Sequence, residues 1–235
     1  MTAAGARPRV EAMKALAFFL SFVVAGVPAA AGPGRSGSCF SFLLQTADFR
    51  GDLATPRVLW HFEKAFSFPR LQAGFAVGVS YGFKADKGAW EVSYRLSAHR
   101  GTSADGAPAS PVVHILELNG RSFLLRESAV HPYFQWGICL PILHLPHGSA
   151  YRGRTSGATF VGGGLNLGAG LAVDIGPTVV VTAGAVNRFV WFLYAYGGGK
   201  GRDINHLTEG YGGPKLGRLL RTSGLSWTIS LGFIL

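Results

Sequence analysis

Charged residues are scarce in this sequence. They make up 14% of the chain, against the roughly 25% of a typical soluble domain, while hydrophobic residues reach 48%. This balance leaves too few charged side chains to cover the surface of an ordinary soluble domain. It indicates apolar surface that faces something other than water.

Cysteine is equally rare, because Cys39 and Cys139 are the only two. This excludes a disulfide-rich scaffold and a cysteine-rich zinc site. One disulfide between the two is an alternative, but the strand order below places them near opposite ends of the structure, which favours free thiols. A lipid-modified Cys39 is disfavoured because Ser36 stands where lipidation asks for an apolar residue.

Long apolar runs are missing after residue 31, although a membrane-spanning helix needs about 20 such residues. The one apolar run, ALAFFLSFVVAGV, follows Arg7, Arg9 and Lys14 and precedes the small residues PAAAG. This order is typical of a cleaved secretory signal peptide, with Met1 or Met13 as the start. We therefore predict a signal peptide at 1–31, a linker at 32–38 and one domain at 39–235. If the exported chain enters a membrane, strands must carry it.

The formal net charge is +10, and it stays positive once residues 1–31 are removed. No helix-turn-helix, zinc-finger or RNA-binding motif accompanies this charge. The expected partners are therefore the bilayer and the phosphates of lipopolysaccharide, and not nucleic acid.

What the sequence does have is strict alternation, as in LQAGFAVGVSYGF at 71–83. Successive side chains of a strand point to opposite faces, so one face here is apolar. The other face holds mainly glycine, alanine and serine. A soluble sheet usually shows charged groups on its second face, and this one does not.

The alternation recurs along the chain and predicts eight strands. The other seven lie near 39–49, 90–99, 112–121, 131–140, 161–175, 178–194 and 225–235. In the strand at 178–194, Asn187 and Arg188 are neighbours and cannot both point inward without a bulge. Because an arginine facing lipid costs about 2–4 kcal/mol, Arg188 is expected to point inward.

The connections alternate in length. Short turns are expected at 84–89, 125–130 and 174–178, and long loops at 49–70, 99–111, 141–158 and 195–221. This order predicts an all-β fold, a transmembrane antiparallel up-and-down β-barrel of eight strands. The alternative, a soluble lipocalin-like barrel, would expose faces of glycine and alanine to water and is disfavoured.

Three segments carry a resemblance: HPYFQWGICLP, GGGLNLGAGLAVDIG and the closing WTISLGFIL. With the signal peptide, they resemble the superfamily of small eight-stranded bacterial outer-membrane β-barrels over residues 39–235. The resemblance implies residence in the outer membrane of a Gram-negative-type bacterium, as a monomer. It also implies recognition of the C-terminal strand by the barrel assembly machinery, although this chain ends in Leu235 where the superfamily has an aromatic residue.

Large polar residues on the inward parity are expected to pair, because buried charges need partners. The predicted interior network comprises Glu91, Arg95, Glu117, Arg121, Asn166 and Arg188. Eight strands leave little free bore, so this network is expected to plug the barrel. A gate or small pore lined by the same groups is the alternative.

The loops hold the remaining candidates. Basic side chains near the headgroup plane would bind lipopolysaccharide phosphates, and the candidates are Arg152, Arg154, Lys200 and Arg202. Asn205, His206, Thr208 and Glu209 partly resemble the residues of a lipid A deacylase, but the match is poor and no catalytic residue is predicted. His144 and His147 alone make a poor metal site, so no metal or cofactor is expected.

Three functions stay open at this point. The favoured one is a non-enzymatic outer-membrane barrel with a structural or surface-interaction role. A narrow channel or a carrier for a small apolar solute comes second, and a lipid A-modifying hydrolase third.

Overall fold

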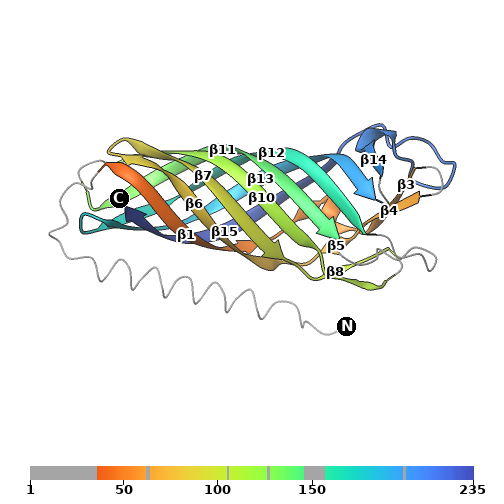
Figure 1. The fold of residues 1–235 in the computed structure, drawn as a ribbon, viewed down its shortest axis with the longest axis horizontal. Coiled ribbons are helices and arrows are strands. Elements are labelled where there is room, and N and C mark those ends of the chain that lie inside the picture. Colours follow the sequence, from red (N-terminus) through yellow and green to blue (C-terminus); the bar gives the residue numbers. More distant parts are fainter. Residues whose placement is uncertain (1–35, 62–63, 105, 126–127, 146–156, 198–199) are drawn as a thin grey trace.

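The computed structural model describes residues 36–61, 64–104, 106–125, 128–145, 157–197 and 200–235. Eight long antiparallel strands close into a barrel, in which the last strand pairs with the first (Figure 1). They are β1 (Gly37–Ala47), β6 (Gly74–Ala85), β7 (Gly88–Ala98), β10 (Val112–Phe123), β11 (Val130–Leu145), β12 (Ala158–Ile175), β13 (Val179–Gly197) and β15 (Leu220–Ile234). The predicted all-β, eight-stranded barrel is confirmed.

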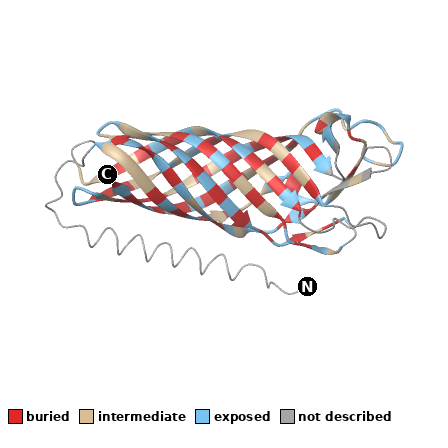
Figure 2. Ribbon diagram, viewed as in Figure 1, coloured by how far each residue is buried: buried red, intermediate tan, exposed pale blue. Residues whose placement is uncertain are grey.

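Burial alternates along most of the barrel wall, except toward the turn end of β12 and β13, and gives the chequered pattern of Figure 2. On β6, Val77 is 58% exposed on the outer face, whereas Ser80 is 3% exposed on the inner face. The exterior is therefore an apolar band, and the small and polar residues line the interior. In the part of the chain described here, no helix is long and apolar enough to cross a membrane.

The two ends of the barrel differ. The short connections at 86–87, 124–129 and 176–178 lie at one end together with Gly37 and Ile234, and we call it the turn end. The long connections, as far as the structure describes them, lie at the other, the loop end. Short and long connections strictly interleave, as the sequence predicts. Outer-membrane barrels place such short turns on the periplasmic side.

The long connections contain structure of their own. It consists of β2 (Arg50–Gly51), η1 (Asp52–Ala54), β3 (Arg57–His61), β4 (Lys64–Phe68), β5 (Arg70–Leu71), β8 (Gly101–Thr102), β9 (Pro108–Ala109), β14 (Lys200–Asp203) and η2 (Ile204–His206). These elements gather beyond the loop end (Figure 1). The sequence offered no periodicity from which to predict them.

Several predicted strand starts were wrong. β7, β12 and β15 begin two, three and five residues earlier than expected, at Gly88, Ala158 and Leu220. β1 begins at Gly37, two residues before Cys39 and inside the expected linker. β6 begins at Gly74, because Leu71 belongs to β5, which pairs with β8 instead of β7. Leu71 is buried among loop residues and does not face outward. Leu71 is apolar and matched the outer parity of β6. Its apolar side chain instead packs in a second hydrophobic core, formed with the long connections.

That second core fills the loop end. Inward residues of the strands, including Ile115, Leu143 and Phe160, pack against Leu53, Leu59, Ile204, Leu207 and Leu220 of the connections and of the start of β15. The interior therefore has two parts, a polar part toward the turn end and an apolar part at the loop end. Burying these leucines fixes the connections over the mouth of the barrel.

A β-bulge interrupts the alternation of β13. Val161 of β12 pairs with Tyr194, but the next residue, Gly162, pairs with Phe192, so Leu193 is extra. An extra residue inverts the facing of all that follow it. Before the bulge the even-numbered residues of β13 point inward; after it, Ala195 is buried and Tyr194 and Tyr196 are exposed.

Both cysteines are free thiols. Cys39 lies near the turn end, and Cys139 points inward about halfway along β11. The expected free thiols are confirmed, but Cys139 lies near the middle of the barrel and not near the opposite end from Cys39.

Candidate functional site

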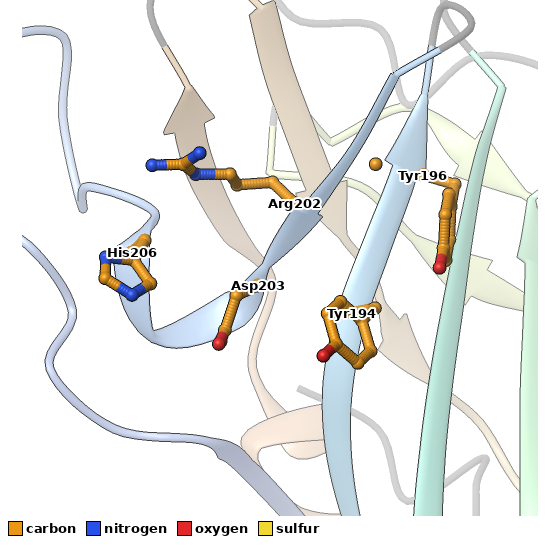
Figure 3. Close-up of a pocket in the computed structure, with 6 residues that line it drawn as sticks. Tyr194, Tyr196, Arg202, Asp203 and His206 are labelled. Carbon is orange, nitrogen blue, oxygen red and sulfur yellow. The ribbon is translucent and has the colours of Figure 1, made fainter.

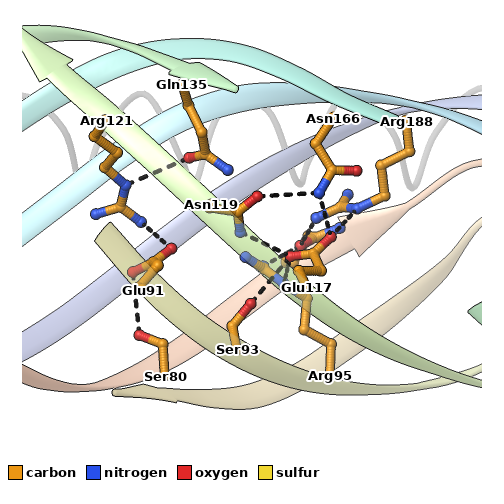
Figure 4. A network of polar contacts seen from close by, with 11 residues as sticks. Ser80, Glu91, Ser93, Arg95, Glu117, Asn119, Arg121, Gln135, Asn166 and Arg188 are labelled. Carbon is orange, nitrogen blue, oxygen red and sulfur yellow. Dashed lines mark hydrogen bonds and ion pairs between the residues drawn. The ribbon is translucent and has the colours of Figure 1, made fainter. Parts of the chain in front are cut away.

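A single carboxylate, Glu117 on β10, lies at the centre of the barrel interior (Figure 4). Its Oε2 accepts a hydrogen bond from Arg95 Nε at 2.7 Å, and its Oε1 accepts one from Arg188 Nε at 2.5 Å. All three side chains are at most 3% exposed. Ion pairs removed from water to this degree are stable only when further hydrogen bonds satisfy the charged groups.

Neutral side chains supply those further bonds. Ser93, Asn119 and Asn166 donate to Glu117 at 3.1, 3.4 and 3.3 Å. The Gln45 side-chain oxygen accepts from Arg188 Nη2 at 3.1 Å and also from Arg95 Nη1. The carboxylate is saturated with donors from four strands, β7, β10, β12 and β13, so it holds fixed charges in place and has no lone pair available for general-base chemistry.

A second ion pair lies nearer the turn end. Arg121 Nη2 donates to Glu91 Oε1 at 2.8 Å, and Arg121 Nε donates to Gln135 Oε1 at 3.4 Å. The guanidinium also lies over the Tyr133 ring, 5.2 Å from its centre. Ser80 donates to the other oxygen of Glu91 at 3.3 Å.

A third cluster closes the turn end. Lys84 Nζ lies 2.8 Å from Asp174 Oδ2, and His131 Nε2 lies 3.1 Å from the same oxygen. The other ring nitrogen of His131 contacts the Leu125 carbonyl at 2.5 Å. This cluster ties the turns at that end to the barrel wall.

The structure brings the predicted interior residues into two of these clusters. Arg95, Glu117, Asn166 and Arg188 form the first, and Glu91 and Arg121 form the second. Sequence reasoning missed Gln45, Asn119 and Gln135, although each lies on the inward parity of a predicted strand. It also left out Lys84, Asp174 and His131, because Lys84 and Asp174 were assigned to turns.

Outside the barrel, Asp52 of η1 joins two connections. Arg218 donates to both of its carboxylate oxygens at 2.9 and 3.3 Å. Arg57 Nη2 lies 3.1 Å from Asp52 Oδ1, and the Arg221 backbone N–H donates to Asp52 Oδ2 at 2.8 Å. Burial opposes ionisation of Asp52, but these bonds and positive charges outweigh it and lower its pKa. The same carboxylate raises the pKa of Arg218.

A hollow of about 430 Å³ lies beside the end of β13 at the loop end of the barrel (Figure 3). Its lining residues are Tyr194, Tyr196, Gly201, Arg202, Asp203 and His206. The bulge at Leu193 turns both tyrosines outward toward it. Arg202 pairs with the inward-facing Ala195, so its side chain leaves the opposite face of β14 from the tyrosines, and it is exposed.

The other candidate loop residues are less defined. Lys200 begins β14, and its side chain is not described; Arg152 and Arg154 lie outside the described residues. The four predicted lipopolysaccharide contacts are therefore not brought together by what the structure describes.

The residues considered for hydrolysis have other partners. Thr208 Oγ1 donates to the Gly210 carbonyl at 2.7 Å, and Glu209 lies 3.3 Å from Arg57. Asp203 accepts the Asn205 backbone N–H at 3.1 Å and so caps η2. Among the described residues, no three His, Cys, Asp or Glu side chains gather as metal ligands would. His147, considered with His144, lies outside that part of the chain.

No protein-family model matches this chain, and no curated protein sequence matches it. Solved structures of small outer-membrane barrels are similar in fold. Neisserial surface protein A shares 16% identity over 84% of this chain and 98% of that one, with a TM-score of 0.48. OprG from Pseudomonas aeruginosa shares 11% over 87% and 98%, with a TM-score of 0.47. Ail of Yersinia pestis shares 15% over 87% and 99%, with a TM-score of 0.37.

Proposed function

We propose that this chain is an integral outer-membrane β-barrel protein without enzymatic activity, whose interior is closed and whose loop end contacts lipopolysaccharide. It is exported by the signal peptide at 1–31, inserted by the assembly machinery through its C-terminal strand, and monomeric. The observation that carries the proposal is the inversion of polarity in this barrel. Its exterior is apolar, and its ion pairs lie inside.

The exterior supports insertion in a membrane. Outward residues of β11 run through Phe134, Trp136, Ile138 and Leu140, each 45–56% exposed. Aromatic side chains border the band at both ends, with Phe83 and Trp90 toward the turn end and Tyr194 and Tyr196 toward the loop end. Aromatic girdles at both interfaces are typical of transmembrane barrels.

Cysteine labelling tests the insertion. With Cys39 and Cys139 replaced by serine, a cysteine at Val77 or Leu167 should resist a water-soluble maleimide in intact membranes. One at Tyr211, 71% exposed in the last connection, should react. Equal labelling at all three positions would show that the apolar band faces water.

Two layers support a closed interior. Ions that enter from the turn end would meet the Glu117 cluster, and solutes from the loop end would meet the apolar core of Ile115, Leu143 and Phe160. An eight-stranded barrel has just enough interior for such side chains. We therefore expect no discrete conductance in a planar bilayer, and steady openings of the wild-type chain would contradict the closed interior.

The loop end supports contact with lipopolysaccharide. Arg202 is exposed on β14, beyond the loop end, and its side chain leaves the opposite face of β14 from the outward Tyr194 and Tyr196. Arginine binds phosphate through several charge-assisted hydrogen bonds, which Arg202→Gln would remove. Native mass spectrometry of the barrel with lipopolysaccharide should detect weaker retention in this variant. Lys87→Gln, at an exposed turn of the opposite end, is the matched control.

One observation favours the alternative of a narrow channel. Arg188 Nη1, Gln135 Nε2, Tyr133 Oη and Thr228 Oγ1 are buried without a hydrogen-bond partner among the described residues. Buried polar atoms of this kind are usually satisfied by water, which would hydrate the middle of the interior. The bilayer recording decides between the two functions.

A further inference from the structure

Two histidines point outward from neighbouring strands at the loop end. In the register of β10 and β11, His114 pairs with Ile142 and His144 pairs with Val112, so the histidines are diagonal neighbours on the outer face. Diagonal neighbours of an antiparallel pair lie roughly 7 Å apart. Both imidazoles therefore reach a single small ligand.

Each imidazole is held by a hydroxyl group. His114 Nδ1 lies 2.7 Å from Tyr94 Oη, and His144 Nδ1 lies 3.0 Å from Thr159 Oγ1. Within the described residues, neither Nε2 has a hydrogen-bond partner. When the hydroxyl donates to Nδ1, Nε2 carries the hydrogen and donates outward; a protonated ring donates from both nitrogens and adds a positive charge.

The height of the pair on the barrel is informative. Outward residues of β11 are apolar from Val130 to Ile142, and His144 follows them. Fourteen residues of a strand tilted as in membrane barrels rise about 34 Å, which is enough to span the roughly 25 Å apolar band of such proteins. His144 pairs with Thr159 of β12, and Thr159 pairs with Tyr196 of β13, so the outward neighbours of His144 in these two strands are also polar or amphipathic. The histidines thus lie where hydrocarbon ends and headgroups begin.

The surroundings select the charge of the ligand. Tyr94 of β7 is the titratable group that faces His114. The residues that pair with His114 are Leu96 on β7 and Ile142 on β11, and both are apolar. His144 is flanked by Val112 and Thr159. No carboxylate or basic side chain of the described residues faces either imidazole, so an anion is the complementary ligand.

We propose that His114 and His144, oriented by Tyr94 and Thr159, bind the phosphate group of a lipid headgroup in the surrounding leaflet, and bind it more tightly as the pH falls. The inference rests on the proposed membrane insertion, but not on Arg202, which lies near the end of β13. A protonated imidazole donates charge-assisted hydrogen bonds to a phosphate in place of neutral ones.

The test uses the full mature barrel in phosphatidylcholine nanodiscs that contain lipid A with its phosphates or dephosphorylated lipid A. Native mass spectrometry should find phosphorylated lipid A retained about tenfold better at pH 5.5 than at pH 8, because one charge-assisted bond corresponds to about that factor. The double variant His114→Gln/His144→Gln should lose this gain, while Lys87→Gln should keep it. Imidazole NMR signals of His114 and His144 should shift when phosphorylated lipid A is added, and the signal of the buried His99 should not.

Several outcomes would overturn the proposal. These are wild-type pH dependence in the double variant, equal retention of dephosphorylated lipid A, or unchanged His114 and His144 signals. Displacement of the lipid by millimolar inorganic phosphate would assign the site to the free anion instead. A gel position that does not change on boiling would show that no barrel forms, and would refute the proposed function separately from this site.

Discussion

Arg188 on β13 donates a hydrogen bond to Glu117 on β10 across the interior of the barrel, with 2.5 Å between the two atoms. The residues are 71 positions apart in the chain and both are essentially excluded from solvent. Arg95 binds the second oxygen of the same carboxylate. One negative charge therefore holds two positive charges from opposite sides.

Glu117→Gln should strongly destabilise the barrel. Removing one member of a buried ion pair leaves the other charged, and here two guanidinium groups would lose their counter-charge, at a cost of roughly 3–5 kcal/mol. Urea unfolding in detergent micelles measures the change. Glu209→Gln removes the exposed ion pair with Arg57 and should cost under about 1 kcal/mol. Similar losses for the two variants would argue against a central role for Glu117.

The bulge at Leu193 predicts an inverted pattern of accessibility along β13. Spin labels at Tyr194 and Tyr196 should be mobile and accessible, and a label at Ala195, which is fully buried, should be immobile. Without the bulge the order would be reversed. Electron paramagnetic resonance of the three variants, each made without Cys39 and Cys139, distinguishes the two arrangements.

The connections at the loop end should loosen in acid through Asp52. Because its pKa is lowered in the folded chain, Asp52 contributes stability that is complete above the unfolded value of about 3.9 and is lost as the pH falls through the folded value. The hydrogen-exchange protection of residues 52–60, corrected for the intrinsic pH dependence of exchange, should fall below about pH 4. Asp52→Asn should exchange faster at neutral pH and lose most of this dependence, and an unchanged profile would contradict the assignment.

A second acid transition should begin nearer neutrality and depend on His99. Burial lowers the pKa of His99, against the opposing effects of its hydrogen bond to the Gln72 carbonyl and of the charge of Asp48. Its stability contribution is therefore complete above the unfolded value of about 6.5 and is lost as the pH falls through the folded value. Melting temperatures between about pH 7 and pH 5 should fall in the wild type and much less in His99→Gln.

Much of the barrel could be predicted from the sequence, because strand alternation is a local property. The inward facing of Arg188 and the outward facing of Asn187 followed from one energetic argument, and the structure has both. Glu117, Arg95 and Arg121 could be named as inward polar groups for the same reason. Their pairing could not be predicted, because it depends on how far each strand is shifted against the next.

The loop end was the part that sequence reasoning could not reach. Leu71 looked like a lipid-facing residue, and Asp52 had no distinguishing neighbour. Both acquire their roles from connections that meet only after the barrel closes. Tyr196 is a sharper case, because an extrapolation of the alternation from Arg188 points it inward, and the single extra residue at Leu193 turns it outward.

The sequence by itself determined the fold class, a closed sheet with an apolar exterior and a polar interior. Successive side chains of a strand point to opposite faces, so the residue types at alternate positions indicate whether each face meets hydrocarbon or the interior. The tertiary structure alone decided which charges share Glu117, where the apolar core of the loop end lies, and which histidines stand together on the outer face. Those relationships depend on register and bulges, and these are fixed by the fit between strands that are distant in the chain.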